Sequence, residues 1–245
     1  MWHSQFLDRK NLTDTEKENL TEVQRRWRKD GYVVLENFIP DKALDNYTAL
    51  RKRLDLGPKP FPNWTPYIDF PEVADILLHE KLANMLKHLL GADLACHFAL
   101  SAYASTQRGW HQDDYLNPPN VHSKYAAIWL AIDDIPINSG PFELYPGTHQ
   151  WPCMRRHLVT KYLNNDAGKL HPLWATLAEP LVNAAAEKEF KKRGLKKVTW
   201  LGKKGDLLIW SGRLMHRGSV AVDSSLLRPG IIAHYSDTTD RKSVV

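Results

Sequence analysis

A histidine and a carboxylate, His111 and Asp113, stand two positions apart in the chain. In an extended backbone, side chains at positions i and i+2 project to the same side, about 7 Å apart. An imidazole and a carboxylate placed in this way can converge on one metal ion. Pro118 and Pro119 end any strand soon afterwards, so the pair is expected near a strand end, where sites are commonly built. Alone, a His-x-Asp tripeptide is weak evidence, because it occurs by chance in many chains.

The candidate third ligand is His216, and Arg228 follows it by twelve residues at the head of the next expected strand. An arginine on a neighbouring strand could hold a carboxylate beside the metal through two hydrogen bonds. Two histidines and one carboxylate form the ligand set of non-haem Fe(II) oxygenases, which leaves three positions open. A 2-oxo acid can fill two of these and oxygen the third. Asp114 is an alternative carboxylate, although on a strand it would point away from His111.

The elements that must position these residues change in character along the chain. Helical patterns cover residues 13–29, a segment beginning at Pro40, and residues 71–90, with one apolar β-branched run at 32–35. From residue 93 onward, short strands alternate with turns rich in glycine and proline. Helices followed by many short strands predict a mainly β fold with flanking helices, built on a jelly-roll core (a cupin-like double-stranded β-helix).

Length and composition fit this fold. A chain of 245 residues, 43% of them hydrophobic and 25% charged, has the size and composition of one globular domain. We expect a single domain over 1–245, with a helical support and first strand at 1–92. A jelly-roll core at 93–236 would then carry an insertion at 151–195. No run approaches the ~18 apolar residues of a membrane span. With two cysteines and no secretory signal pattern, a cytoplasmic protein is expected.

Positive charge is concentrated in one segment of a chain whose net charge is +5. Residues 187–204 hold eight basic and two acidic side chains. The segment is either a solvated helix end with its loop, or a region that attracts an anionic substrate. Nucleic acid is not an expected partner, because no series of aromatic residues alternates with these lysines to form a stacking surface.

Several further motifs accompany the candidate ligands in a fixed order. They are Asp-Gly-Tyr-Val-Val-Leu at 30–35, His-Gln-Asp at 111–113, Trp-Leu-Ala-Ile-Asp-Asp at 129–134, Gly-Pro-Phe-Glu-Leu at 140–144, Pro-Gly-Thr-His at 146–149, and Gly-Asp-Leu-Leu-Ile-Trp at 205–210. His216 and Arg228 close the series. In these motifs, their order and their spacing, the chain resembles the phytanoyl-CoA dioxygenase family of Fe(II)/2-oxoglutarate-dependent oxygenases nearly from end to end.

The resemblance implies a catalytic iron site and a co-substrate site. It implies Fe(2+) held by His111, Asp113 and His216, and 2-oxoglutarate held by Arg228 with help from Ser219, Trp129 and Gln112. Trp129 could equally be a core residue of an apolar strand. In this family the helper serine often stands two residues after the second histidine, where this chain has Gly218. The gap to the arginine is also one residue longer than expected, and a one-residue insertion explains both differences.

The family resemblance implies an enzyme that hydroxylates a small-molecule metabolite, consuming O2 and converting 2-oxoglutarate to succinate and CO2. Asp113 favours hydroxylation, because halogenating relatives carry a small residue there. Desaturation, epoxidation and ring closure stay open. The alternatives are a non-catalytic jelly-roll binding protein and a metal cupin that does not use 2-oxoglutarate. Nucleic-acid demethylases have the same triad but carry a second arginine six residues after the first, where this chain has His234.

The substrate pocket is expected to lie among three regions that vary most between such enzymes. These are the proline-rich loop near Trp64, the strand face with Tyr103 and His97, and the 151–195 insertion. Strand alternation would place His97, Ser101 and Tyr103 on one face, where they either line the pocket or pack. A small, soluble substrate is expected, with an anionic one as an option. No nucleic acid, membrane or protein partner is indicated.

Overall fold

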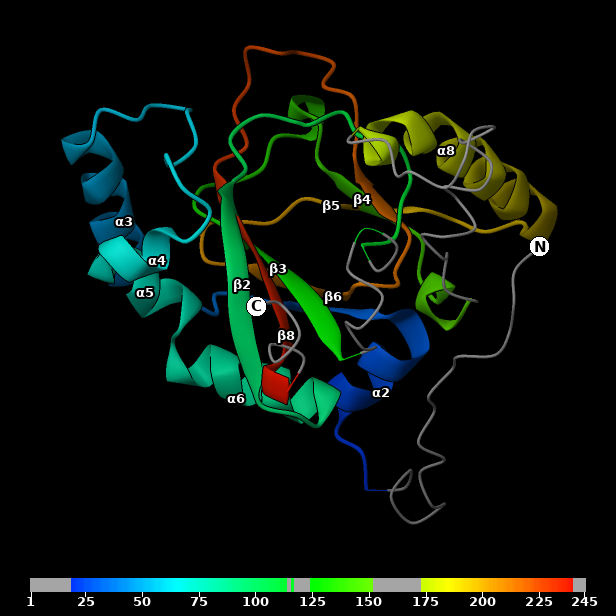
Figure 1. Cartoon of the computed structure of the whole chain (residues 1–245), viewed down its shortest axis with the longest axis horizontal. Coiled ribbons are helices and arrows are strands. Elements are labelled where there is room, and N and C mark those ends of the chain that lie inside the picture. Colours follow the sequence, from blue (N-terminus) through cyan, green and yellow to red (C-terminus); the bar gives the residue numbers. More distant parts are fainter. Residues whose placement is uncertain (1–18, 114–115, 117–123, 152–172, 240–245) are drawn as a thin grey trace.

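The computed structural model describes residues 19–113, 116, 124–151 and 173–239 (Figure 1). Two antiparallel sheets form its centre. The larger has the order β1 (Tyr32–Leu35), β6 (Leu207–Ser211), β3 (Tyr125–Ala131), β8 (Gly230–Asp237) and β2 (Leu94–Ser101). The smaller has the order β5 (Val198–Trp200), β4 (Phe142–Leu144) and β7 (His216–Gly218). The predicted β core with flanking helices is confirmed.

The helices before β2 cover one face of the larger sheet. They are α2 (Glu22–Asp30), α3 (Asp41–Arg53), α4 (Pro66–Asp69), α5 (Pro71–Leu77) and α6 (Glu80–Leu90). Thr21 and Gln24 form a capping box that starts α2, and Gly31 ends it with a φ of 79°. The first part of the helical pattern predicted over 13–29, up to residue 18, lies outside the described residues. The single helix predicted over 71–90 is wrong, because His79 caps a new helix by accepting a hydrogen bond from the Lys81 N–H.

Strand β3 shows how one run of sequence serves two cores. Ala126, Ile128 and Leu130 pack in the cluster that includes the helices, whereas Ala127 and Trp129 belong to a second cluster inside the barrel. Every residue of β3 is buried. A central strand covered on both faces is apolar throughout, as the sequence at 125–132 predicts.

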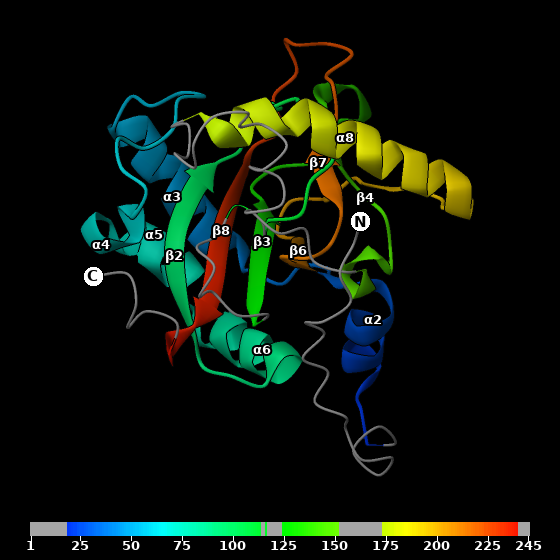
Figure 2. The same cartoon turned by 45° about the vertical axis from the view of Figure 1, so that its right-hand side comes forward.

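Helix α8 (Trp174–Arg193) lies in the predicted insertion, of which residues 152–172 are outside the described part. In Figures 1 and 2 it lies at the opposite end of the strands from α6. Its Glu179 accepts a hydrogen bond from the Gly109 N–H, and its Asn183 accepts one from the Trp110 N–H. The helix therefore fixes the backbone just before His111. No helix among the described residues is both long and apolar enough to cross a membrane.

A β-bulge in β2 changes which side chains face the inside of the barrel. The register with β8 shifts between Cys96 and Phe98, so His97 is an extra residue on its strand. His97 contacts a serine of β8, whereas the Ser101 hydroxyl accepts a hydrogen bond from Arg51 on α3. The prediction that His97 and Ser101 share a face is therefore wrong, because simple alternation does not hold across a bulge.

Candidate metal centre

The three predicted metal ligands lie together inside the barrel. His111 forms an isolated antiparallel bridge with His216 of β7, with backbone hydrogen bonds of 3.1 and 3.0 Å. The Oδ1 atom of Asp113 is 3.7 Å from the Nε2 atom of His111 and 3.6 Å from the Nε2 atom of His216. Ligand atoms on one face of an octahedron lie about 3 Å apart, so a small inward shift would close this group around an ion. Asp114, the alternative ligand, lies outside the described residues.

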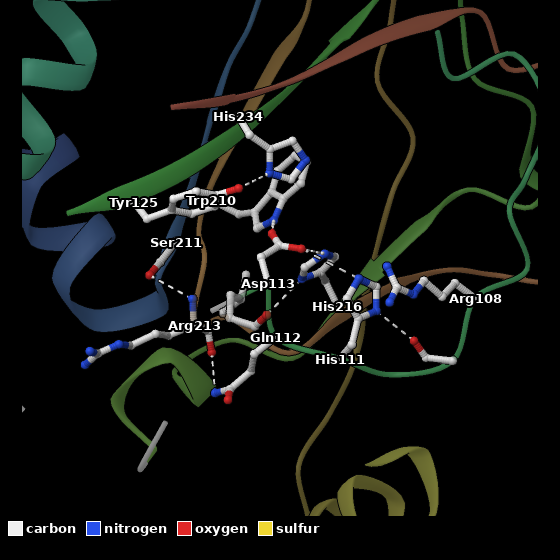
Figure 3. A network of polar contacts seen from close by, with 12 residues as sticks. Arg108, His111, Gln112, Asp113, Tyr125, Trp210, Ser211, Arg213, His216 and His234 are labelled. Carbon is white, nitrogen blue, oxygen red and sulfur yellow. Dashed lines mark hydrogen bonds and ion pairs between the residues drawn. The ribbon is translucent and has the colours of Figure 1, made fainter. Parts of the chain in front are cut away.

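Hydrogen bonds aim the three side chains at one point (Figure 3). The Nδ1 atom of His111 pairs with the carbonyl of Gly109 at 2.8 Å, and that of His216 pairs with the carbonyl of Leu214 at 2.9 Å. Both rings therefore present Nε2 to the site. The Trp210 indole N–H donates to Oδ2 of Asp113 at 3.2 Å, which leaves Oδ1 for the centre. Partners of this kind orient metal ligands.

Burial sets the charges of the group. The exposed fraction of each of the three residues is 6% or less. Burial lowers the pKa of His111 and of His216, so both imidazoles are neutral. Burial alone would raise the pKa of Asp113, but nearby imidazoles, with His216 first, and the Trp210 hydrogen bond lower it. Two neutral nitrogens and one carboxylate form a donor set that suits Fe(II).

Arg228 is buried without an anionic partner among the described residues. It is 2% exposed, its Nη2 donates to the carbonyl of Ala104 at 3.0 Å, and its guanidinium stacks 4.4 Å from the centre of the Trp129 ring. Its Nε and Nη1 atoms, and the indole nitrogen of Trp129, find no hydrogen-bond acceptor in that part of the chain. Burial lowers the pKa of Arg228 to about 10, which leaves it charged at neutral pH. Buried, unpaired donors of this kind fit a ligand carboxylate.

Two of the three predicted helper residues, Ser219 and Gln112, already have partners within the protein. The Ser219 hydroxyl donates to the carbonyl of Pro141 at 2.9 Å. Gln112 is fully buried, and its side-chain nitrogen donates to the carbonyl of Arg213 at 2.7 Å. Gly218 lies beside the arginine, since a Cβ atom built on it would be 3.4 Å from Nη2 of Arg228.

The three predicted substrate residues lie in different surroundings. Trp64 is 65% exposed, and its ring meets the ring of Phe98 edge-on at 6.0 Å. The Tyr103 ring packs 4.2 Å from the Arg51 guanidinium, and burial raises its pKa to about 12. His97 lies on the inner side of the barrel, with its ring 6.0 Å from that of Tyr125.

Sequence reasoning missed two polar residues of the barrel interior, His234 and Tyr125. The Nδ1 atom of His234 lies 2.7 Å from the Tyr125 hydroxyl, and Figure 3 shows the pair on the far side of Asp113 from His111. A signal was present in the chain. His234 stands six residues after Arg228, and residues separated by an even number share one face of a strand.

Solved structures with the same fold include complexes with iron or 2-oxoglutarate. The epimerase SnoN, in complex with Fe3+, alpha ketoglutarate and nogalamycin RO, aligns with a TM-score of 0.66 and 19% identity over 89% of this chain and 83% of that chain. EctD from S. alaskensis, with 2-oxoglutarate and 5-hydroxyectoine, gives 0.61 and 17% over 98% and 81%. AviO1 from Streptomyces viridochromogenes gives 0.56 and 17% over 88% and 94%. At these identities the similarity shows a common fold.

The family comparison is specific. A search of curated proteins finds no match. The family model described as phytanoyl-CoA dioxygenase (PhyH) matches residues 68–228, which is more than half of the chain. The resemblance read from the motifs is therefore confirmed, and with it the predicted class, an iron- and 2-oxoglutarate-dependent dioxygenase. The chain belongs to the phytanoyl-CoA dioxygenase family.

Proposed function

We propose that this protein hydroxylates a small-molecule metabolite, with Fe(II) bound by His111, Asp113 and His216 and 2-oxoglutarate bound through Arg228. The observation that carries the proposal is the guanidinium of Arg228, which is 2% exposed and has two nitrogens without an acceptor among the described residues. A buried cation that lacks an anion is costly to the fold. A dicarboxylic co-substrate supplies the missing anion.

The residues of the chain prepare the site before any ligand arrives. The carbonyls of Gly109 and Leu214 hold the two imidazoles with Nε2 inward, and Trp210 holds Asp113. Iron bound there supplies the capacity to activate oxygen with 2-oxoglutarate as reductant. Arg228 and the Trp129 indole nitrogen orient the co-substrate, and the buried walls keep bulk water from the reacting groups.

A small organic substrate fits this proposal better than a large or strongly anionic one. The aligned SnoN and EctD structures contain nogalamycin RO and 5-hydroxyectoine, respectively, and both ligands are small molecules. In the basic segment at 187–204, Lys197 pairs with Glu143 and Arg193 pairs with Glu189. These two cations form ion pairs within the protein, which supports the interpretation of the segment as a solvated helix end and loop. With two cysteines in the chain, we place the reaction in the cytoplasm.

Anaerobic titration with Fe(II) and then 2-oxoglutarate tests the proposal directly. We expect a visible charge-transfer absorption band that needs both ligands, and Arg228→Ala should weaken 2-oxoglutarate binding while iron is retained. Succinate formation across a metabolite library, with mass spectrometry for a product heavier by one oxygen, then finds the substrate.

The alternatives give different results in the same assays. A non-catalytic binding protein would show no absorption band and no succinate. A metal cupin that does not use 2-oxoglutarate would bind iron, and its activity would be unaffected by Arg228→Ala.

A further inference from the structure

The inner face of the larger sheet carries two adjacent rows of side chains with different chemistry. Cross-strand pairing defines the first row as Leu208, Trp129, Ile232 and Leu100, and the second as Trp210, Ala127, His234 and Phe98. Arg228 stacks on Trp129 in the first row, whereas Trp210 in the second row donates to Asp113. The first row therefore lies at the end of the barrel that would hold the co-substrate. The second row lies beside the metal centre.

His234 is the polar centre of the second row. It is 7% exposed, and its ring stacks on that of Phe98 with centroids 4.3 Å apart. Its Nδ1 atom is engaged by the Tyr125 hydroxyl at 2.7 Å, and no described residue forms a hydrogen bond with its Nε2 atom. A neutral imidazole has two nitrogens with opposite roles, so the bond to Tyr125 fixes what Nε2 can offer a ligand.

The side chains around His234 are aromatic, apart from the Asp113 carboxylate to which Trp210 donates a hydrogen bond. We call Phe98, Tyr125, Trp210 and His234, together with the bulged His97, the aromatic wall. The His97 ring bonds the Ser236 hydroxyl at the same end of the barrel. Ala127, the second-row residue between Trp210 and His234, has a side chain of a single methyl group. The wall contains no arginine, lysine or carboxylate, in contrast to the end that carries Arg228.

We infer that the aromatic wall binds the substrate and that the Nε2 atom of His234 forms a hydrogen bond to an uncharged hydroxyl or carbonyl group on a flat, apolar part of it. This inference rests on the proposed function, since the co-substrate must occupy the Arg228 end. Ring faces supply stacking surface, and a few placed polar groups fix the orientation of a ligand. An anionic group would be buried here beside the Asp113 carboxylate, with no cationic side chain of the wall to pair with it, which is unfavourable. His234 is thus a specificity-determining residue, and Tyr125 is a positioning residue.

Three fluorinated probes of one size test the chemistry of the wall. They are 4-fluorophenol, 4-fluorobenzoate and 4-fluorotoluene, which differ in one substituent and can be followed by 19F NMR line broadening even when binding is weak. We expect the phenol to bind about three- to tenfold more tightly than the toluene, as one net hydrogen bond allows. The benzoate should bind more weakly than the phenol once saturating 2-oxoglutarate occupies Arg228.

Two substitutions separate the nitrogens of His234. His234→Asn keeps a group near Nδ1 for Tyr125 but has nothing at Nε2, so the preference for the phenol over the toluene should be lost. His234→Gln places an amide near the Nε2 position and should retain the preference. Tyr125→Phe should reduce it, whereas the control Tyr67→Phe should not, because that hydroxyl bonds the Cys96 carbonyl on the helix-covered side.

The outcomes are distinct from those that test the proposed function. Equal binding of all three probes, a preference for the benzoate, or an unchanged preference in His234→Asn would overturn the inference. Each variant is also titrated with Fe(II) and 2-oxoglutarate, where unchanged affinities show an intact metal centre. If the wild-type protein bound neither ligand but still preferred the phenol, the proposed function would fail and the binding surface would stand.

Discussion

The two faces of the larger sheet are both covered, but they differ in chemistry. On the helix-covered face, Ile128, Ile209 and Ile231 form an aliphatic layer whose exposed fractions are 2% or less. On the inner face, Trp129 and Trp210 are buried as deeply, yet they stand beside a buried guanidinium and a buried carboxylate. An aliphatic layer needs nothing but close packing. Buried donors without acceptors need a ligand, so the inner face is organised for binding at some cost to stability.

Among substitutions at the inner face of the sheet, Asp113→Ala should have the largest effect on ligand binding. Removal of the carboxylate should reduce Fe(II) affinity by more than about 100-fold, because even the partners that orient metal ligands are worth 10- to 100-fold. The apo-protein should unfold at the same or higher urea concentration, since a buried carboxylate is lost. Iron content by elemental analysis and urea titration measure the two quantities. Retained iron would remove Asp113 from the ligand set.

The next largest effect is expected for Arg228→Met. The variant should bind 2-oxoglutarate about 30- to 1000-fold more weakly, as truncation of one partner of a buried charge pair does. The free energy of unfolding of the apo-protein should stay level or rise, because an unpaired buried charge is replaced by a thioether of similar length. The absorption band and urea titration report on the two effects. A large loss of stability with normal co-substrate affinity would make Arg228 a structural residue.

Acid should destabilise the apo-protein through its inner face. Burial holds the pKa of His234 at about 4, and burial also lowers the pKa of His111 and of His216. An unfolded histidine gains a proton near pH 6.5, whereas these folded ones do not. The stability is therefore fully present above about pH 6.5 and falls toward pH 4, by up to about 1.4 kcal/mol per pH unit for each group. Urea titrations at pH 7.5 and 5.5 measure the slope.

A substitution of His234 tests whether this residue causes the dependence of the unfolding free energy on pH. His234→Gln should make the pH dependence of stability shallower by the contribution of one proton. The same slope in His234→Gln as in the wild type would assign the acid sensitivity to other residues.

The meeting of the predicted metal ligands could be expected from the sequence, whereas the aromatic wall could not. His111, Asp113, His216 and Arg228 occur in short motifs whose spacing reflects strand geometry, so their meeting could be expected. The orientation of His97 depends on a bulge that no residue pattern announces. The division of residues 71–90 into two helices depends on a histidine acting as a helix cap, which is an uncommon choice for that position.

The smallest predicted effects come from a pair of neighbours on β8 that lie on opposite faces. Ile231 belongs to the helix-covered cluster and is 2% exposed, whereas Ile232 pairs across the sheet with Trp129 on the inner face. Ile231→Val should lower the free energy of unfolding by about 1 kcal/mol and leave 2-oxoglutarate affinity unchanged.

Ile232→Val removes the same methyl group from a less buried residue, so its stability cost should be smaller. The gap would lie beside the ring on which Arg228 stacks, so 2-oxoglutarate affinity should fall by about two- to fivefold. Urea titration and the absorption band measure both quantities in both variants. If the two substitutions had equal effects on 2-oxoglutarate affinity, the proposed difference in function between the two faces of the sheet would be wrong.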